Sequence, residues 1–118
     1  MAEGNFTRYS EFWPFYLREH SQSRTRALHY AGTAIGLTLL ILFLVTLNWW
    51  LLLAAFVSGY LFAWIAHFFI ERNRPATFRY PVWSFYSDLR MFTFAALGRL
   101  RQELIKAGVV SGPPVEKM

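Results

Sequence analysis

Apolar residues dominate the middle of the chain. Between residues 27 and 70 there is no Lys, Arg, Asp or Glu, and every charged residue lies outside this stretch. A spanning helix needs roughly 20 apolar residues, so the stretch is long enough for two. Asn48, a polar turn-former followed by two tryptophans of the kind that sit at membrane interfaces, lies at its centre. The pattern predicts helices over 28–46 and 49–70 that form a transmembrane hairpin.

The two flanks are predicted to be helices at the membrane surface. Residues 10–21 mix aromatic and charged side chains, as an interfacial helix does. Over 82–107 the apolar positions recur near helical spacing, but charged residues interrupt them, which favours an amphipathic helix over a third span. Residues 108–118 are predicted to be a flexible tail. The predicted fold is therefore an all-α membrane protein, a two-helix transmembrane hairpin with amphipathic N- and C-terminal helices, in which residues 1–118 form a single domain.

The distribution of charge predicts the topology. Basic residues precede and follow the apolar stretch, and the turn at its centre carries no charge. The positive-inside rule therefore places both termini of this integral membrane protein in the cytoplasm. The net charge of +5 is explained by this topology and by contact with anionic headgroups. Membrane lipid, and not nucleic acid, is the predicted partner, and the lack of cysteine excludes disulfides and thiolate chemistry.

Two of the three histidines are placed symmetrically in the predicted hairpin. His29 and His67 lie the same number of residues before and after Asn48. An antiparallel hairpin brings them to the same depth, roughly 28 Å from the turn and at the cytoplasmic boundary. His29 shares a helix face with Gly32 and Gly36, whose small-xxx-small spacing lets helices approach closely. We therefore expect the two imidazoles to face each other.

Two further donors lie close along the chain. Glu71 follows His67 by four residues, so it shares a helix face and can bind the same ion or exchange a proton with it. His20 precedes His29 on the segment that enters the membrane. Such nitrogen and oxygen donors suit iron, zinc or manganese, and two histidines with one carboxylate are typical of non-haem Fe(II) oxygenases. Alternatively, each histidine is a structural residue near the interface, and His67 with Glu71 forms only a helix-end hydrogen bond.

Two runs of the sequence resemble the motifs of a family of small membrane proteins. The first comprises Tyr16–His20 and Arg24–Thr33, and the second is Gly59–Ala76. The family was long described as a domain of unknown function, and its characterised fungal member is an endoplasmic-reticulum Fe(II)-dependent 2-hydroxy-fatty-acid dioxygenase. The similarity covers roughly residues 12–95, and the chain resembles bacterial members. One departure is that Ser21–Arg26 lacks an asparagine usual between the first two histidines.

The resemblance implies an enzyme of fatty-acid α-oxidation that converts 2-hydroxy fatty acids to fatty acids one carbon shorter. It implies a bacterial inner-membrane protein, or an endoplasmic-reticulum protein if the source is eukaryotic. Fe(II) is the implied cofactor, with zinc or manganese as other possible metals. The implied metal-binding and catalytic residues are His20, His29 and His67. Glu71 is the next candidate for the metal-binding and catalytic set, either as a ligand or as a group that orients His67. The candidates for pairing with the substrate carboxylate are Arg24, Arg72 and Arg74.

Two other functions fit the same sequence. The first is a non-catalytic membrane module that packs against a partner through Gly32 and Gly36 and holds anionic lipid with its basic flanks. The second is a different metal-dependent lipid hydroxylase or hydrolase. Two spanning helices scarcely enclose a site, so a further hypothesis is that the flanking helices or, in a homo-oligomer, a second copy help to enclose it.

Overall fold

The computed structural model describes residues 6–111. The chain forms two compact units, of which one is Gln22–Pro75 and the other combines the residues before and after it. All regular secondary structure in the described part of the chain is helical, which confirms the prediction of an all-α protein. Most of the predicted flexible tail, 108–118, lies outside the described residues, and the single domain stays a prediction.

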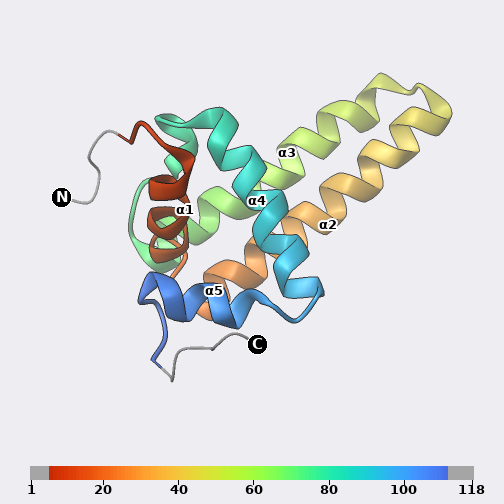
Figure 1. Ribbon diagram of the computed structural model, residues 1–118. Coiled ribbons are helices and arrows are strands. Elements are labelled where there is room, and N and C mark those ends of the chain that lie inside the picture. The colour runs from red at the N-terminus through yellow and green to blue at the C-terminus, as the bar shows by residue number, and fades with distance from the viewer. Residues whose placement is uncertain (1–5, 112–118) are drawn as a thin grey trace. The chain divides into compact units, whose positions relative to one another are not determined.

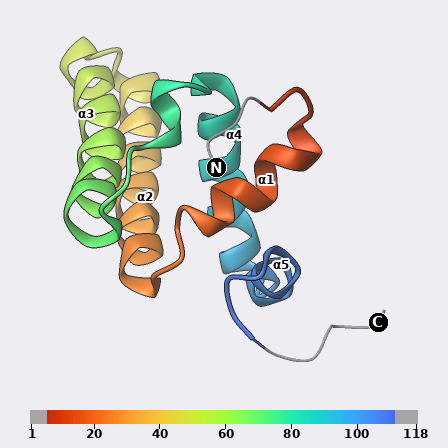
Figure 2. The same ribbon diagram turned by 90° about the vertical axis from the view of Figure 1, so that its left-hand side faces the viewer.

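The unit Gln22–Pro75 is built on two long helices. Helix α2 is Ser23–Thr46, and α3 is Trp49–Ile65, which continues as a π-helix, η1, over Ala66–Glu71. Figures 1 and 2 show α2 and α3 side by side along their length. The helices predicted over 28–46 and 49–70 are thus present. Helix α2 begins earlier than predicted, because its first turn contains polar and basic residues that the apolar pattern does not include.

A two-residue connection reverses the chain between these helices. Leu47 adopts a left-handed conformation with φ 56° and ends α2. Asn48 begins α3, and its Oδ1 accepts a hydrogen bond from the Trp50 N–H at 3.2 Å. This side-chain cap satisfies one of the N–H groups that the first turn of a helix leaves unpaired. The turn predicted at Asn48 is therefore present and capped.

Gly32 and Gly36 lie where α2 approaches α3 most tightly. A Cβ atom on Gly32 would lie 3.0 Å from Phe62 Cβ and 3.2 Å from the Ser58 carbonyl oxygen. One on Gly36 would lie 3.2 Å from the Ala55 carbonyl oxygen. Only glycine fits such contacts without a shift of the neighbouring helix. The predicted close approach at these two positions is confirmed.

The outer surface of this helix pair is apolar. Val45 is 76% exposed and Phe56 is 57% exposed. The hydroxyls of Thr38, Thr46 and Ser58 each donate to the carbonyl oxygen four residues earlier at 2.8 Å, so these polar groups are satisfied within their own helices, as hydrocarbon surroundings demand. Both α2 and the continuous segment of α3 and η1 are long and apolar enough to cross a membrane.

The other unit contains the remaining helices. They are α1 (Tyr9–Arg18), the short 3-10 helix η2 (Ala76–Phe78), α4 (Pro81–Ala96) and α5 (Leu100–Ala107). Helix α1 covers most of the helix predicted over 10–21 and packs against α4 and α5. The fully buried side chains of this unit include Phe12, Tyr16, Leu17 and Met91.

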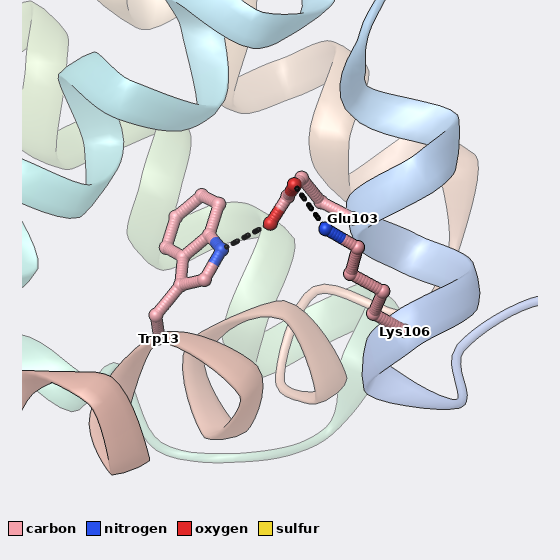
Figure 3. Close-up of polar contacts among 3 residues, drawn as sticks. All are labelled: Trp13, Glu103 and Lys106. Carbon is pink, nitrogen blue, oxygen red and sulfur yellow. Dashed lines mark hydrogen bonds and ion pairs between the residues drawn. The ribbon is translucent and has the colours of Figure 1, made fainter. Parts of the chain in front are cut away.

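Polar contacts from α1 fix the register of this packing. The indole N–H of Trp13 donates to Glu103 Oε1 at 3.0 Å, and Lys106 Nζ lies 3.5 Å from Glu103 Oε2 (Figure 3). Tyr9 Oη and Ser87 Oγ lie 2.7 Å apart. The Trp13 indole N–H and the Tyr9 hydroxyl are the polar ends of aromatic side chains. Their hydrogen bonds let α1 pack these rings against α4 and α5 without leaving the polar ends unsatisfied.

The prediction of one continuous helix over 82–107 is wrong. Helix α4 ends and α5 begins on either side of Gly98, which has φ 73°. The Arg99 N–H donates to the Phe94 carbonyl at 2.8 Å, and the Gly98 N–H donates to the Ala95 carbonyl at 3.1 Å. This pair of bonds around a left-handed glycine is the Schellman arrangement that ends a helix. The apolar periodicity continued across the break and hid it.

Candidate metal centre

His29 of α2 and His67 of η1 face each other. Their Nε2 atoms lie 3.3 Å apart, and the rings meet edge to face at 86°. Both side chains are buried, with 5% and 2% of their surface exposed. The close approach at Gly32, less than one turn after His29, brings the helices near enough for this contact. The pairing predicted from the equal arms of the hairpin is confirmed.

Asn73 holds His67 through two bonds. His67 Nδ1 donates to Asn73 Oδ1 at 2.7 Å, and the Asn73 N–H donates to the His67 carbonyl oxygen at 2.9 Å. The chain turns back over the end of η1 because Arg72 is left-handed, with φ 63°. Asn73 was not among the predicted site residues. Its place directly after the His67–Glu71 helical turn was the available signal.

The bond to Asn73 fixes which ring nitrogen of His67 carries the proton. A neutral imidazole that donates from Nδ1 has its lone pair on Nε2. That lone pair points toward His29, and two ring nitrogens at 3.3 Å either share a proton or bind one cation. This separation is short enough for both nitrogens to bind the same ion, because metal–nitrogen distances are about 2.0–2.1 Å. The pair therefore fits two adjacent ligands of one metal ion.

Thr25 adds a second sign of a binding site. It lies four residues before His29, on the same face of α2. Its side chain is fully buried, and its hydroxyl has no hydrogen-bond partner within the described structure. A buried hydroxyl in this state costs about 1–3 kcal/mol. A polar ligand or water molecule held beside the histidine pair would recover that free energy.

Glu71 contacts the start of α2. Its Oε2 accepts a hydrogen bond from the Gln22 N–H at 2.5 Å, and Gln22 Nε2 donates to the Ile70 carbonyl oxygen at 3.1 Å. These bonds join the end of η1 to the residue that precedes α2. The role of Glu71 as a ligand stays a prediction. The predicted carboxylate-binding residues all have exposed side chains: Arg24, Arg72 and Arg74.

His20 belongs to the other unit and follows the end of α1. Its Nδ1 donates to the Tyr16 carbonyl oxygen at 2.6 Å, and its ring stacks on the Tyr16 ring with the centroids 4.1 Å apart. The Tyr16 hydroxyl in turn donates to Asp88. His20 is 1% exposed. Its Nδ1 is therefore engaged in the same way as that of His67, and a histidine that donates from Nδ1 binds a metal through Nε2. Its position relative to the pair stays a prediction.

Comparison with known families gives one match. A family model described as "2-hydroxy-palmitic acid dioxygenase Mpo1-like" matches residues 6–100. The matched span includes all three histidines, both long helices and Asn73. No curated protein and no solved structure matches the chain.

Proposed function

The chain belongs to the 2-hydroxy-palmitic acid dioxygenase Mpo1-like family, and on this premise we propose that it is a membrane-embedded Fe(II)-dependent dioxygenase of 2-hydroxy fatty acids. The observation that carries the proposal is the buried pair of His29 and His67, with Nε2 atoms 3.3 Å apart. A buried pair of imidazoles with one Nδ1 already bonded to an amide oxygen is a typical feature of a metal site.

The proposed metal ligands are the three histidines. In the proposal His20 joins His29 and His67 as the third ligand, which its place along the chain supports, since only Ser21 and Gln22 separate it from the start of α2. Imidazole ligands suit iron, zinc, copper and nickel. Within the proposal Glu71 either completes the set or orients a ligand. When bound, Fe(II) supplies the redox chemistry that couples dioxygen to oxidation of the substrate.

The proposed reaction balances without a further co-reactant. A 2-hydroxy acid and dioxygen give the acid one carbon shorter, carbon dioxide and water, and the electrons that leave the two substrate carbons reduce the dioxygen. The carboxylate and 2-hydroxyl distinguish this substrate from an ordinary fatty acid. In the proposal, Arg24, Arg72 and Arg74 pair with the carboxylate, and the Thr25 hydroxyl lies on the helix face that presents His29.

The proposal places α2 and the segment of α3 and η1 across the membrane as a hairpin. The apolar outer surface and the internally bonded hydroxyls of these helices support this placement. The helices of the other unit would lie at the interface as amphipathic flanks, with both termini in the cytoplasm. The acyl chain of the substrate would then remain among apolar side chains while its head group reaches the histidines.

Product analysis tests the proposed activity. The purified protein in lipid nanodiscs is loaded with Fe(II) and incubated with 2-hydroxypalmitate and oxygen, and the fatty acids are measured by gas chromatography and mass spectrometry. We expect pentadecanoate to form in a dioxygen-dependent manner. Palmitate, which lacks the 2-hydroxyl, should not be shortened. Absence of pentadecanoate from an iron-loaded, oxygenated sample would refute the activity.

Variants separate the enzyme from the two other functions. His29→Ala and His67→Ala should each abolish pentadecanoate formation and lower the bound iron, because each removes a ligand from the pair. Gly59→Ala is the matched control, since a Cβ there meets no atom within 4 Å, and it should keep both. A protein that binds no metal in stoichiometric amount would instead be a non-catalytic module. A metal-bound protein that releases or hydroxylates fatty acids without shortening them would be a different lipid enzyme.

A further inference from the structure

We propose that Asn73 is a positioning residue that fixes the tautomer and ring orientation of His67. Its side-chain oxygen holds the proton on Nδ1 and thereby presents the Nε2 lone pair to His29 and to a metal. The inference depends on the proposed function only for the identity of that metal. The tautomer itself is a property of the metal-free protein and can be measured there.

The two bonds between Asn73 and His67 act together. The main-chain bond, 2.9 Å from the Asn73 N–H to the His67 carbonyl oxygen, fixes the Asn73 backbone over the end of η1. The side-chain bond, 2.7 Å between Asn73 Oδ1 and His67 Nδ1, then has little freedom to move. A histidine ring whose Nδ1 is held in this way cannot rotate about its side chain without breaking the bond.

The backbone around Asn73 is shaped for this contact. Arg72 lies in the left-handed region with φ 63°, which costs a residue with a Cβ roughly 1–2 kcal/mol. Of the other left-handed helix ends in the described residues, those at Gly98 and Gly108 carry glycine and the one at Leu47 does not. The segment around His67 is also a π-helix, a form that is rare and frequent at functional sites. Both features bring the Asn73 side chain back over His67.

The choice of tautomer matters for the pair. If His67 carried its proton on Nε2, that proton would point toward His29 at 3.3 Å and would block a metal at this nitrogen. The hydrogen bond at the other ring nitrogen decides which tautomer is present. Asn73 therefore acts on the metal through His67 and does not itself have to contact the metal or the substrate.

Nitrogen NMR of the metal-free protein tests the assignment. The protein is labelled with ¹⁵N-histidine, and His67 is identified by its loss in His67→Ala. Spectra are recorded at about pH 8.5, where a free imidazole is neutral. We expect the wild type to show a protonated Nδ1 and an unprotonated Nε2 for His67. Asn73→Ala should give a mixture of tautomers, whereas Asn73→Asp, which keeps an acceptor oxygen, should retain the wild-type pattern.

Metal titration provides the second measurement. Binding of Mn(II) or Co(II) to Asn73→Ala should weaken roughly 10- to 100-fold, the usual effect of losing a partner behind a histidine ligand, and Asn73→Asp should restore it. Asn48→Ala, which removes the cap of α3 far from the histidines, controls for a general loss of stability. A wild-type His67 protonated on Nε2, or an unchanged tautomer in Asn73→Ala, would overturn the proposal.

The two measurements also separate this inference from the proposed activity. A protein with the expected tautomer that forms no pentadecanoate would retain Asn73 as the positioning residue and lose the dioxygenase assignment. An active protein whose His67 tautomer does not depend on Asn73 would keep the dioxygenase assignment and lose Asn73 as the positioning residue. If Asn73→Ala fails to fold, Asn73→Asp and the wild-type spectrum still decide between the two tautomers.

Discussion

An alanine at position 32 tests how strongly the histidine pair depends on the packing of α2 against α3. Its methyl carbon would lie 3.0 Å from Phe62 Cβ, 3.2 Å from the Ser58 carbonyl oxygen and 3.3 Å from the Gly59 carbonyl oxygen. Two of these three contacts are to backbone atoms, which cannot rotate away. The helices must therefore separate by a few tenths of an ångström around this position.

The net effect on stability follows from two opposing terms. Alanine is a better helix former than glycine by about 0.8–1.0 kcal/mol. Inserting a methyl group into a tight contact typically costs about 1–3 kcal/mol. Because Gly32 has three close neighbours, we expect overpacking to exceed the gain in helix propensity and Gly32→Ala to destabilise the protein by up to about 2 kcal/mol.

Two other glycines of the same helix pair provide a graded control. At Gly36 a Cβ would meet one atom, the Ala55 carbonyl oxygen at 3.2 Å, and at Gly59 it would meet none within 4 Å. We expect Gly59→Ala to be neutral or stabilising, Gly36→Ala to be intermediate, and Gly32→Ala to be the least stable. Thermal unfolding in one detergent, followed by circular dichroism, measures the order.

The same variants report on the histidines. His29 precedes Gly32 by three residues, so separation of the helices there lengthens the 3.3 Å contact with His67. Gly32→Ala should bind Mn(II) or Co(II) more weakly than Gly36→Ala. The reasoning is refuted if Gly32→Ala is as stable as Gly59→Ala, because the close contact would then have no energetic consequence. Equal metal affinities in Gly32→Ala and Gly36→Ala would show that other contacts determine the distance between His29 and His67.

Two further predictions concern the residues around the pair. Replacing Glu71 with alanine removes the acceptor of the Gln22 N–H and should destabilise the protein by about 1 kcal/mol in thermal unfolding. Glu71→Gln keeps an acceptor oxygen and should lose less stability. Loss of metal from a stable Glu71→Gln protein would instead assign Glu71 as a ligand. Thr25→Val keeps the side-chain shape but removes a buried hydroxyl without a partner, so the metal-free protein should become more stable by about 1 kcal/mol. Thr25→Ser should show no such gain, and a destabilised Thr25→Val would mean that the hydroxyl is satisfied in solution.

The helix pair could be predicted because the residue patterns that produce it are local and recur along both helices. The absence of charge between residues 27 and 70 sets the extent of the two helices, and Asn48 sets the turn. Once the turn is known, counting from it places His29 opposite His67. Small residues at Gly32 and Gly36 then indicate which faces meet, since only those faces allow a close approach.

The break at Gly98 could not be predicted from the apolar pattern. A turn that interrupts a helix for only a few residues can leave the apolar spacing nearly intact. The evidence for the break lies in backbone bonds around Gly98, chiefly that of the Arg99 N–H to the Phe94 carbonyl. A glycine within a helical pattern has two outcomes, a tolerated interior position or a helix end, and the packing of α1 against both α4 and α5 selects the second.

Asn73 was missed for a different reason. Its contact with His67 depends on the π-helical geometry of η1 and on the left-handed conformation of Arg72. Neither feature follows from residue preferences, because arginine rarely adopts that conformation. Glu71 illustrates the same limit, since helical spacing placed it beside His67 but did not indicate its bond to Gln22, far away in the sequence.

The two-residue connection at Leu47 and Asn48 has a consequence for how the hairpin can change in length. His29 and His67 meet because they lie the same number of residues before and after Asn48. An insertion in one arm would slide one imidazole past the other by about 1.5 Å per residue and rotate it by roughly a quarter turn. Equal insertions in both arms, a whole turn at a time, would keep the histidines opposed while the apolar length grows. Under the proposed membrane placement, a homologous chain adapted to a thicker bilayer should therefore differ by paired insertions on either side of the turn.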